Sequence, residues 1–436
     1  MARGAYVGVN NVARKIKKGY FGVDGVARRI KKAYIGIGGV ARPCWSSGSE
    51  YFGAITPMSV AHTSRAATTV GNYALFGGGA KGLTYDPTVD VYDQYLTHTT
   101  PTVLSVGRTE LTATTVGNYA LFGGGYYYAG GSNYMSTVDA YDQHLTHTTP
   151  TALSVARRYL AATTVGNYAL FGGGSDANGH LSTVDAYDQS LTRTIPTVLS
   201  VARQDLAATT VGNYALFGGG GDDNGYTTTV DAYDQSLTRT IPKVLSKSRE
   251  DVAATTVGNY ALFGGGFASG YYSNVDAYDQ SLTRTTPTAL SVPRGYMGAT
   301  TVGNYAMFGG GYGSTYFDTV DVYDQYLTRT LQTPLSVGRS RPVATTVGCY
   351  ALFGGGSSGG TTYDVVDAYA VYELSPPGPT SLTIGITNGT FYLMQIPNDG
   401  GFTAEISEGV FYLRQPEAGS NYTAEITDGI FYLKGV

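Results

Sequence analysis

A unit of 45 to 49 residues repeats seven times along the chain, and this repetition restricts the fold more than any other feature. Each copy contains the string Ala-Thr-Thr-Val-Gly-Asn-Tyr-Ala-Leu-Phe-Gly-Gly-Gly or a close variant of it. The phenylalanine of this string occurs at Phe76, Phe122, Phe171, Phe217, Phe263, Phe308 and Phe353. Repeats of this length indicate a small supersecondary unit that buries its apolar surface against its neighbours.

Each repeat reads as four short strands. In the fourth copy, the small and β-branched residues 207–211 form the first strand, and a Gly-Asn turn leads to a second strand at 214–217. Three glycines end this strand, a variable loop follows, and residues 229–233 and 238–245 form the third and fourth strands. Four antiparallel strands repeated seven times predict an all-β fold that closes radially into a seven-bladed propeller.

The last repeat lacks its fourth strand. It has three strands, at about 343–347, 350–353 and 364–370, and then continues into Ser375-Pro376-Pro377. The segment from Tyr51 to Ser59 precedes the first repeat as each fourth strand precedes the next repeat, and His62 stands where the other repeats carry an arginine. We therefore expect the N-terminal strand to complete the last blade, which leaves the ring without an exposed sheet edge.

Three features of the unit resemble a kelch repeat: a glycine pair after the second strand, a Val-x-x-Tyr-Asp third strand, and an arginine before the next blade. The arginine is found at Arg108, Arg157, Arg203, Arg249, Arg294 and Arg339. The tryptophan that kelch repeats place early in the fourth strand is missing, and Thr194 is at that position. The resemblance covers about residues 50–374. The recurrent aspartate of the third strand, such as Asp185 or Asp231, is expected to be a structural partner of the arginine.

Two shorter repeats flank the propeller region. Residues 1–45 repeat every 14 residues and residues 376–436 every 20, and each copy reads as a hairpin with a two-residue turn such as Asp24-Gly25. We expect three parts: a basic hairpin head at 1–45, the propeller at 46–375 and a hairpin tail at 376–436. Because isolated hairpins are marginal in water, head and tail should stack on one another, on other copies of the chain or on a partner.

Charge is low and unevenly distributed. Charged residues make up 14% of the chain and the net charge is −4, yet residues 1–42 carry +9 and the remainder −13. This balance shows no general signal for nucleic-acid binding. There is no run of about 18 apolar residues, so we expect no membrane insertion, and no secretory signal is visible.

The sequence shows no motif that would bring catalytic or metal-binding residues together. Most of the five histidines, His62, His98, His144, His147 and His180, stand where other repeats carry Arg or Ser, which favours a surface role. Residues 176–179 and 222–225 resemble calcium loops but lack the remaining ligands, so turn chemistry is the favoured interpretation. We expect a protein that is not an enzyme and holds no metal or cofactor.

The two cysteines suggest one specific bond. Cys349 replaces the asparagine of the six other Val-Gly-Asn-Tyr turns, in the blade that the N-terminal strand should complete, and Cys44 lies just before that strand. A Cys44–Cys349 disulfide would fasten the closure. The alternative is two unrelated thiols.

Differences between the repeats concentrate in two segments, the loop between strands two and three and the connection between blades. In an up-and-down blade both segments emerge on the same face of the disc. They are rich in Tyr, Gly, Ser, Asn and Asp, as antibody binding loops are. This composition favours a binding face over the alternative, which is loops whose sequences vary because nothing constrains them. The predicted receptor- or glycan-binding residues are Tyr85, Tyr126, Tyr127, Tyr128, Tyr134, Tyr159, Asp176, Asn178, Asp222, Asp223, Tyr226, Tyr271, Tyr272, Tyr296, Tyr312 and Tyr316.

The head, at Tyr6 to Val9, Val12 to Lys18 and their repeats, resembles short repeats of tail and minor structural proteins of phages of Gram-positive bacteria. This resemblance implies a virion component that contacts other virion proteins through the head and a host-surface glycan or protein through the loops, with homo-oligomers possible. The predicted assembly residues, which could instead protect sheet edges, are Lys15, Lys17, Lys18, Arg28, Arg29, Lys31 and Lys32. The alternatives are a bacterial extracellular fibre subunit or surface adhesin, and a carbohydrate-active propeller enzyme.

Overall fold

The computed structural model describes residues 49–371 in full and, on either side of them, the backbone of the strands only. Within these described residues every regular element is a β-strand. The chain divides into two compact units: Glu50–Ala370 form one, and Met1–Ser49 together with Val371–Val436 form the other. Because the described residues include no helix, they include none that could span a membrane.

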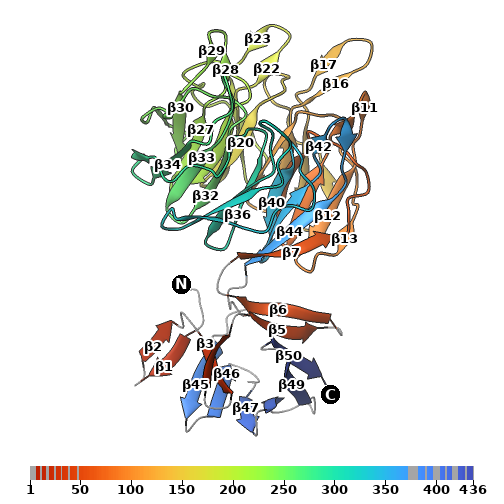
Figure 1. Ribbon diagram of the computed structural model, residues 1–436. Coiled ribbons are helices and arrows are strands. Elements are labelled where there is room, and N and C mark those ends of the chain that lie inside the picture. The colour runs from red at the N-terminus through yellow and green to blue at the C-terminus, as the bar shows by residue number, and fades with distance from the viewer. Residues whose placement is uncertain are drawn as a thin grey trace. The chain divides into compact units, whose positions relative to one another are not determined.

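The unit Glu50–Ala370 is a propeller with seven four-stranded blades, as the repeats predict (Figure 1). Neighbouring strands in a blade are antiparallel, and the first strand of each blade lines a central channel. The first strands are β8 (Ala66–Val70), β14 (Thr112–Val116), β20 (Ala161–Val165), β26 (Ala207–Val211), β32 (Ala253–Val257), β36 (Gly298–Val302) and β40 (Val343–Val347). The second strands are β9 (Tyr73–Gly77), β15 (Tyr119–Gly123), β21 (Tyr168–Gly172), β27 (Tyr214–Gly218), β33 (Tyr260–Gly264), β37 (Tyr305–Gly309) and β41 (Tyr350–Gly354).

The outer half of each blade is built from a third strand of five or six residues and, in six of the blades, a very short fourth strand. The third strands are β12 (Val89–Asp93), β18 (Val138–Asp142), β24 (Val184–Asp188), β30 (Val230–Asp234), β34 (Val275–Asp279), β38 (Val320–Asp324) and β44 (Val366–Val371). The fourth strands are β13 (His98–Thr99), β19 (His147–Thr148), β25 (Arg193–Thr194), β31 (Arg239–Thr240), β35 (Arg284–Thr285), β39 (Arg329–Leu331) and β7 (Ser49–Ile55).

The fourth strands are shorter than predicted, since β31 ends at Thr240 and the prediction extended to Leu245. Pro242 has no N–H with which to continue the ladder. Leu245 is buried, and its N–H donates to the carbonyl of Thr228. The rest of the predicted strand is therefore a connection fastened to the core of the blade.

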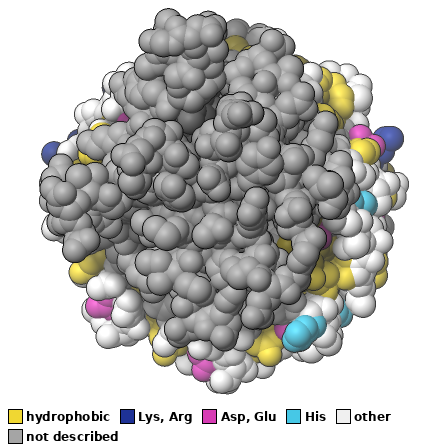
Figure 2. All heavy atoms as spheres, turned by 90° about the horizontal axis from the view of Figure 1, so that it is seen from below, with side chains coloured by type: hydrophobic (Ala, Val, Ile, Leu, Met, Phe, Trp, Pro, Cys, Tyr) yellow, Lys and Arg dark blue, Asp and Glu magenta, His cyan; other side chains and the backbone are white. Residues whose placement is uncertain are grey.

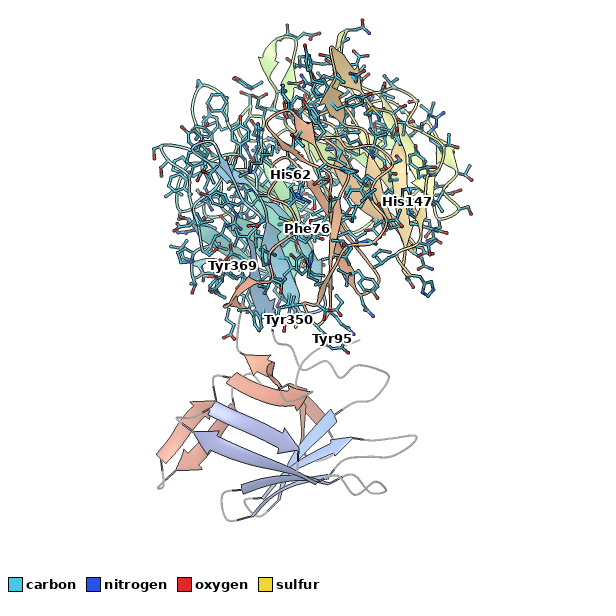
Figure 3. The ribbon with its side chains drawn as sticks, turned by 90° about the vertical axis from the view of Figure 1, so that its right-hand side faces the viewer. His62, Phe76, Tyr95, His147, Tyr350 and Tyr369 are labelled. Carbon is cyan, nitrogen blue, oxygen red and sulfur yellow. The ribbon has the colours of Figure 1, made fainter. Side chains whose placement is uncertain are left out.

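Strand β7 completes the seventh blade, as predicted, in the order β40-β41-β44-β7. Phe52 makes an edge contact with Tyr350 at 5.3 Å near one end of the blade, and the N–H of Met58 donates to Asp364 near the other end. Figure 3 shows Tyr350 and Tyr369 in this blade. The N-terminal strand therefore supplies the outer strand that the last repeat lacks.

A belt of threonine hydroxyls surrounds the channel. At each of the seven blade interfaces one Thr hydroxyl meets that of the neighbouring blade at 2.7 to 3.0 Å, as Thr68 does with Thr115, and Thr69 of blade 1 closes the circle with Thr345 of blade 7. Small β-branched residues allow the first strands to approach closely, and the hydroxyls satisfy one another. This explains why Thr-Thr is retained in every copy.

The first glycine of each glycine triplet leaves room for the next blade. A Cβ on Gly123 would lie 2.7 Å from the ring of Phe171, and one on Gly354 would lie 2.9 Å from the ring of Phe76. Figure 3 shows Phe76 inside the propeller. Each blade therefore rests an aromatic ring on the backbone of the blade before it, including across the closure.

A buried ion pair fastens each connection to the blade that follows. Arg108 donates to Asp139 at 2.7 Å and neither side chain is exposed. The same pair is found as Arg157–Asp185, Arg203–Asp231, Arg249–Asp276, Arg294–Asp321 and Arg339–Asp367. The predicted Arg–Asp partnership is confirmed.

The first blade departs from this pattern. His62 stands at the arginine position, but the guanidinium comes from Arg65, which lies 3.1 Å from Asp90 and 3.0 Å from Nδ1 of His62. On the outer side, Nε2 of His98 lies 2.8 Å from the same carboxylate, at the place that Arg193 takes in a later blade. His98 therefore takes the place of the outer arginine, whereas at the inner position Arg65 does so and not His62. His62 is buried, so the surface role predicted for the histidines is wrong for this one.

Five short hairpins extend the blades between the second and third strands. They are β10 (Ala80–Lys81) with β11 (Thr84–Tyr85), β16 (Tyr126–Tyr128) with β17 (Ser132–Tyr134), β22 (Ser175–Asp176) with β23 (Gly179–His180), β28 (Gly221–Asp222) with β29 (Gly225–Tyr226), and β42 (Ser357–Ser358) with β43 (Thr361–Thr362). Blades 5 and 6 have isolated bridges at this place, such as Phe267 with Tyr271.

The other unit consists of hairpins from both ends of the chain. Its N-terminal strands are β1 (Tyr6–Val9), β2 (Val12–Lys15), β3 (Gly19–Val23), β4 (Val26–Ile30), β5 (Lys32–Ile37) and β6 (Val40–Ser46). Its C-terminal strands are β45 (Leu382–Thr387), β46 (Thr390–Gln395), β47 (Thr403–Ser407), β48 (Val410–Arg414), β49 (Asn421–Thr427) and β50 (Ile430–Gly435). Strands β1 and β45 pair in parallel, as do β5 and β50, so head and tail hairpins associate with one another.

Candidate functional site

The variable segments of all seven repeats lie at one end of the propeller, named here the loop face. In each blade the connection forms a β-bridge with the start of the loop between strands two and three, for example Thr109 with Tyr126 and Arg158 with Ser175. Figure 1 shows the hairpins β16–β17, β22–β23 and β28–β29 together at this end. The predicted common side for both variable segments is therefore correct.

The opposite face is uniform. There, in blades 2 to 5, the glutamine after the third strand bonds the asparagine of the Gly-Asn turn, as Gln143 does with Asn118 at 2.8 Å and Gln235 with Asn213 at 3.0 Å. On the described surface that Figure 2 shows from this side, charged side chains are separated by uncharged surface. The segments that differ between repeats are those of the loop face.

Seven residues, one from each connection, surround the mouth of the channel on the loop face. This mouth ring consists of Ser64, Glu110, Tyr159, Asp205, Asp251, Tyr296 and Arg341. From Glu110 to Arg341, each backbone N–H donates to the carbonyl oxygen of the preceding member, over 2.8 to 3.4 Å. Below the ring, the starts of the first strands enclose a cavity of about 270 Å³.

All seven members of the mouth ring have a positive φ, between 51° and 58°. This left-handed conformation is uncommon for residues other than glycine, and especially for bulky ones such as Tyr159. Elsewhere in the described residues, non-glycine residues take it only in the turns after the third strands, where a leucine such as Leu145 packs against the core. The mouth ring instead carries five different side-chain types at equivalent positions. Strained positions that bear different side chains in otherwise near-identical copies mark the mouth ring as a candidate functional feature.

Three of the seven members of the mouth ring are acidic: Glu110, Asp205 and Asp251. Glu110 accepts hydrogen bonds from the Tyr159 hydroxyl at 2.8 Å and from Arg158 at 3.0 Å. Burial, together with the charges of Asp251 and Glu250, raises the pKa of Asp205 to about 8. Burial also raises the pKa of Asp251. At neutral pH Asp205 is therefore mostly protonated and can donate a hydrogen bond, while Glu110 accepts.

An aromatic group from blades 1 to 3 gathers around Arg158. Its members are Tyr85, Tyr126, Tyr127, Tyr134 and Tyr159. The guanidinium of Arg158 lies 4.6 Å from the ring centroid of Tyr126 and 4.7 Å from that of Tyr159. Cation–π contact fixes these rings, and their exposed parts offer apolar surface for stacking.

A second aromatic group comes from blades 4 to 6. Its members are Tyr226, Phe267, Tyr271, Tyr312, Tyr316 and Tyr296. Consecutive rings from Tyr226 to Tyr316 have centroids 4.9 to 5.9 Å apart. Arg341 lies over the ring of Tyr296 at 4.7 Å. The loop face thus carries two arginine-linked aromatic groups.

The remaining predicted site residues lie on the loop face outside both groups: Tyr128, Asp176, Asn178, Asp222, Asp223 and Tyr272. Asp176 accepts the N–H of Asn178 at 2.7 Å in its own turn, and Asp223 lies 2.7 Å from Nδ1 of His180. Within the described residues no three His, Cys, Asp or Glu side chains are grouped to hold a metal. The first of these contacts is that of turn chemistry, and the second joins the hairpins of blades 3 and 4.

The predicted site did not include the charged residues of the mouth, although they lie in the connections that differ between repeats. They are Glu110, Arg158, Asp205, Glu250, Asp251 and Arg341. The prediction selected mainly tyrosines, by residue type. The signal that it missed was charge at two adjacent positions of the connection in otherwise near-identical copies.

Two further predictions involve the flanking regions. Cys349 lies half-buried in the turn between β40 and β41, and burial raises the pKa of its thiol. The side chain of Cys44 lies outside the described residues, as do those of the seven predicted assembly residues from Lys15 to Lys32. The Cys44–Cys349 bond and the assembly role stay predictions.

No protein-family model and no curated protein sequence matches this chain. Among solved structures, that of the protein YjhT is similar to 72% of this chain and 96% of its own, with 12% sequence identity and a TM-score of 0.48. This likeness concerns the propeller fold alone.

Proposed function

We propose that the propeller is a non-enzymatic receptor-binding module of a phage tail, fibre or tip protein, and that its loop face binds a glycan of the host surface. The observation that carries this proposal is the mouth ring, where a strained backbone position bears seven polar or aromatic side chains between two aromatic groups. Aromatic rings stack on the apolar faces of sugars, and carboxylates, phenols and guanidinium groups bond hydroxyls. A host-surface protein remains the alternative receptor.

The chain enters and leaves the propeller at the uniform face. Phe52, near the start of β7, contacts the ring of Tyr350. Ala370, near the end of β44, pairs with the same tyrosine, which directly follows the turn between β40 and β41. The phage assignment rests on the resemblance of the basic head.

A glycan array with the full chain tests the binding role. Tyr126→Ala and Tyr312→Ala should each weaken binding about 10-fold or more, as truncating an aromatic anchor does at an interface. Tyr326→Ala is the matched control because this tyrosine is 79% exposed and belongs to a corner of the uniform face. If no glycan binds, and the Tyr126–Tyr128 and Tyr271–Tyr272 segments can be replaced without loss of host adsorption, the proposal fails.

Location separates the phage proposal from a bacterial extracellular fibre or surface adhesin. Antibody against the propeller should label tails or tail tips in electron micrographs of virions. Labelling of filaments on uninfected cells would instead support the fibre subunit.

A carbohydrate-active enzyme is a second candidate because Asp205, with its raised pKa, lies near Asp251 and Glu250. A protonated carboxyl beside an ionised one is the arrangement used for general acid–base catalysis on glycosides. Turnover of a bound glycan that Asp205→Asn abolishes without loss of binding would favour this candidate.

A further inference from the structure

A second cavity, of about 160 Å³, opens on the loop face between blades 6, 7 and 1. Tyr296, Tyr312 and Tyr316 supply its aromatic walls, and Thr63, Ser340 and Ser357 supply small hydroxyl-bearing residues. Arg341 is the only lining residue that carries a charge. Every other lining side chain ends in a hydroxyl group. The hydroxyl of Ser340 donates to the carbonyl of Ser357, and that of Tyr296 bonds Asp251, so Thr63, Tyr312, Tyr316 and Ser357 supply the remaining potential donors.

The charge of Arg341 is not neutralised by an ion pair. Among the residues that the structure describes, Arg341 takes part in no salt bridge, whereas Arg158 of the other aromatic group is paired with Glu110 at 3.0 Å. The positive charge of Arg341 counteracts the rise in the pKa of Asp205 and of Asp251. Neither of these carboxyl groups lines the cavity. Its contact with the face of Tyr296 leaves guanidinium N–H groups available, because cation–π attraction does not use them.

A second observation comes from Thr63. Its hydroxyl oxygen is buried and has no hydrogen-bond partner. Buried hydroxyls in proteins are nearly always satisfied, so this atom lacks a partner that a ligand or water in the cavity would provide. The cavity has room for several waters and hence for a small polar group.

We propose that this cavity, named the Arg341 pocket, binds an acidic group, a carboxylate or a phosphate, carried by a sugar residue. A guanidinium binds either group with two parallel hydrogen bonds. The sugar ring would pack against Tyr312 and Tyr316, and the hydroxyl of Thr63 would bond one of the remaining oxygens. The inference rests on the proposed glycan-binding function and specifies its ligand as an acidic glycan.

Titration calorimetry with the full chain and three oligosaccharides that differ only in the terminal residue tests this pocket. The probes end in glucuronate, in glucose 6-phosphate and in glucose. We expect at least one acidic probe to bind about 10-fold or more tightly than the glucose probe, as a charge-assisted contact predicts. Comparison of the glucuronate and phosphate probes tells which acid the pocket prefers.

Three variants locate the effect. Arg341→Gln should remove the preference for an acidic probe while binding of the glucose probe persists, and Arg341→Lys should retain part of the preference. Lys243→Gln, which removes the same charge from an exposed site away from the pocket, should change nothing. Equal binding of acidic and neutral probes, or a preference that survives in Arg341→Gln, would overturn the pocket and leave the glycan-binding proposal standing. Absence of binding to all three probes and to the glycan array would overturn both.

Discussion

The hydroxyl of Tyr51 donates a 2.7 Å hydrogen bond to the carboxylate of Asp367, a residue 316 positions later in the chain. In six blades the corresponding oxygen faces a histidine or arginine from the fourth strand, as His147 faces Asp139 and Arg329 faces Asp321. In the seventh blade a phenol from the N-terminal strand takes this place. One contact thus joins the two ends of the propeller in a blade built from both.

Tyr51→Phe tests the closure. Loss of a hydrogen bond to a buried carboxylate should lower the free energy of unfolding by about 1–3 kcal/mol, measured by urea denaturation of the full chain. Tyr326→Phe, at an exposed position, is the control and should change stability by no more than about 0.5 kcal/mol. Equal stability of the Tyr51 variant and the wild type would mean that β7 closes the ring without this bond.

Gly123→Ala tests the contact between blades. The new Cβ would lie 2.7 Å from Cε1 of Phe171, so the next blade must shift, at a cost of about 1–3 kcal/mol in the free energy of unfolding. Gly131→Ala provides a matched control because its Cβ would meet open space. A thermal unfolding series of the two variants should separate them by several degrees. Identical melting temperatures would contradict the account of the glycine triplet.

Arg249→Gln and Arg284→Gln compare the two cations around Asp276. Arg249 is fully buried at 2.7 Å from the carboxylate, whereas Arg284 is 15% exposed at 3.3 Å. Removing the buried partner should cost about 3–5 kcal/mol, because it leaves a buried charge without its main counter-ion. Removing the outer one should cost about 1 kcal/mol. Urea denaturation of both variants measures the difference, and a larger effect for Arg284 would reverse the assigned roles.

The raised pKa of Asp205 predicts a pH dependence. Between its usual pKa near 4 and its value of about 8 in the fold, the folded chain holds a proton that the unfolded chain has released, so this group lowers stability as pH rises through that range. Asp205→Asn should therefore be more stable than the wild type at pH 8, and the difference should shrink towards pH 4. Urea denaturation at both pH values measures it.

Asp318→Asn, at an exposed position on the loop face, is the control for this experiment and should follow the wild type at both pH values. A stability difference between Asp205→Asn and the wild type that is independent of pH would show that Asp205 is ionised in the fold.

Much of the propeller could be predicted because each blade is a local unit. The small and β-branched residues 207–211, the Gly-Asn turns and the glycine triplets all reflect contacts within about 45 residues. The missing fourth strand identified the segment that begins at Tyr51 as its replacement. The fourth strands were predicted too long because Pro242 and Leu245 direct the chain back to the core, and a pattern of apolar residues does not distinguish this from a strand.

The candidate site was predicted only in part. Tyrosines such as Tyr126 and Tyr312 were recognised by their type and by variation between copies. The importance of Asp205 and Arg341 depends on a positive φ, on burial and on which charges lie nearby, and these quantities arise from blades that are far apart in the chain. The sequence also does not show that Asp90 pairs with Arg65 and not with His62, the residue at the usual arginine position.

The sequence by itself determined the number of blades, their strands and the side on which the variable loops gather, because periodicity and turn residues act over short distances. Only the tertiary structure decided which side chains meet across the channel mouth, since ring closure brings residues such as Thr63 and Tyr296 to one cavity from opposite ends of the repeat array. The sequence shows which side chains are present. Which of them meet in space depends on where the closed ring places each backbone position.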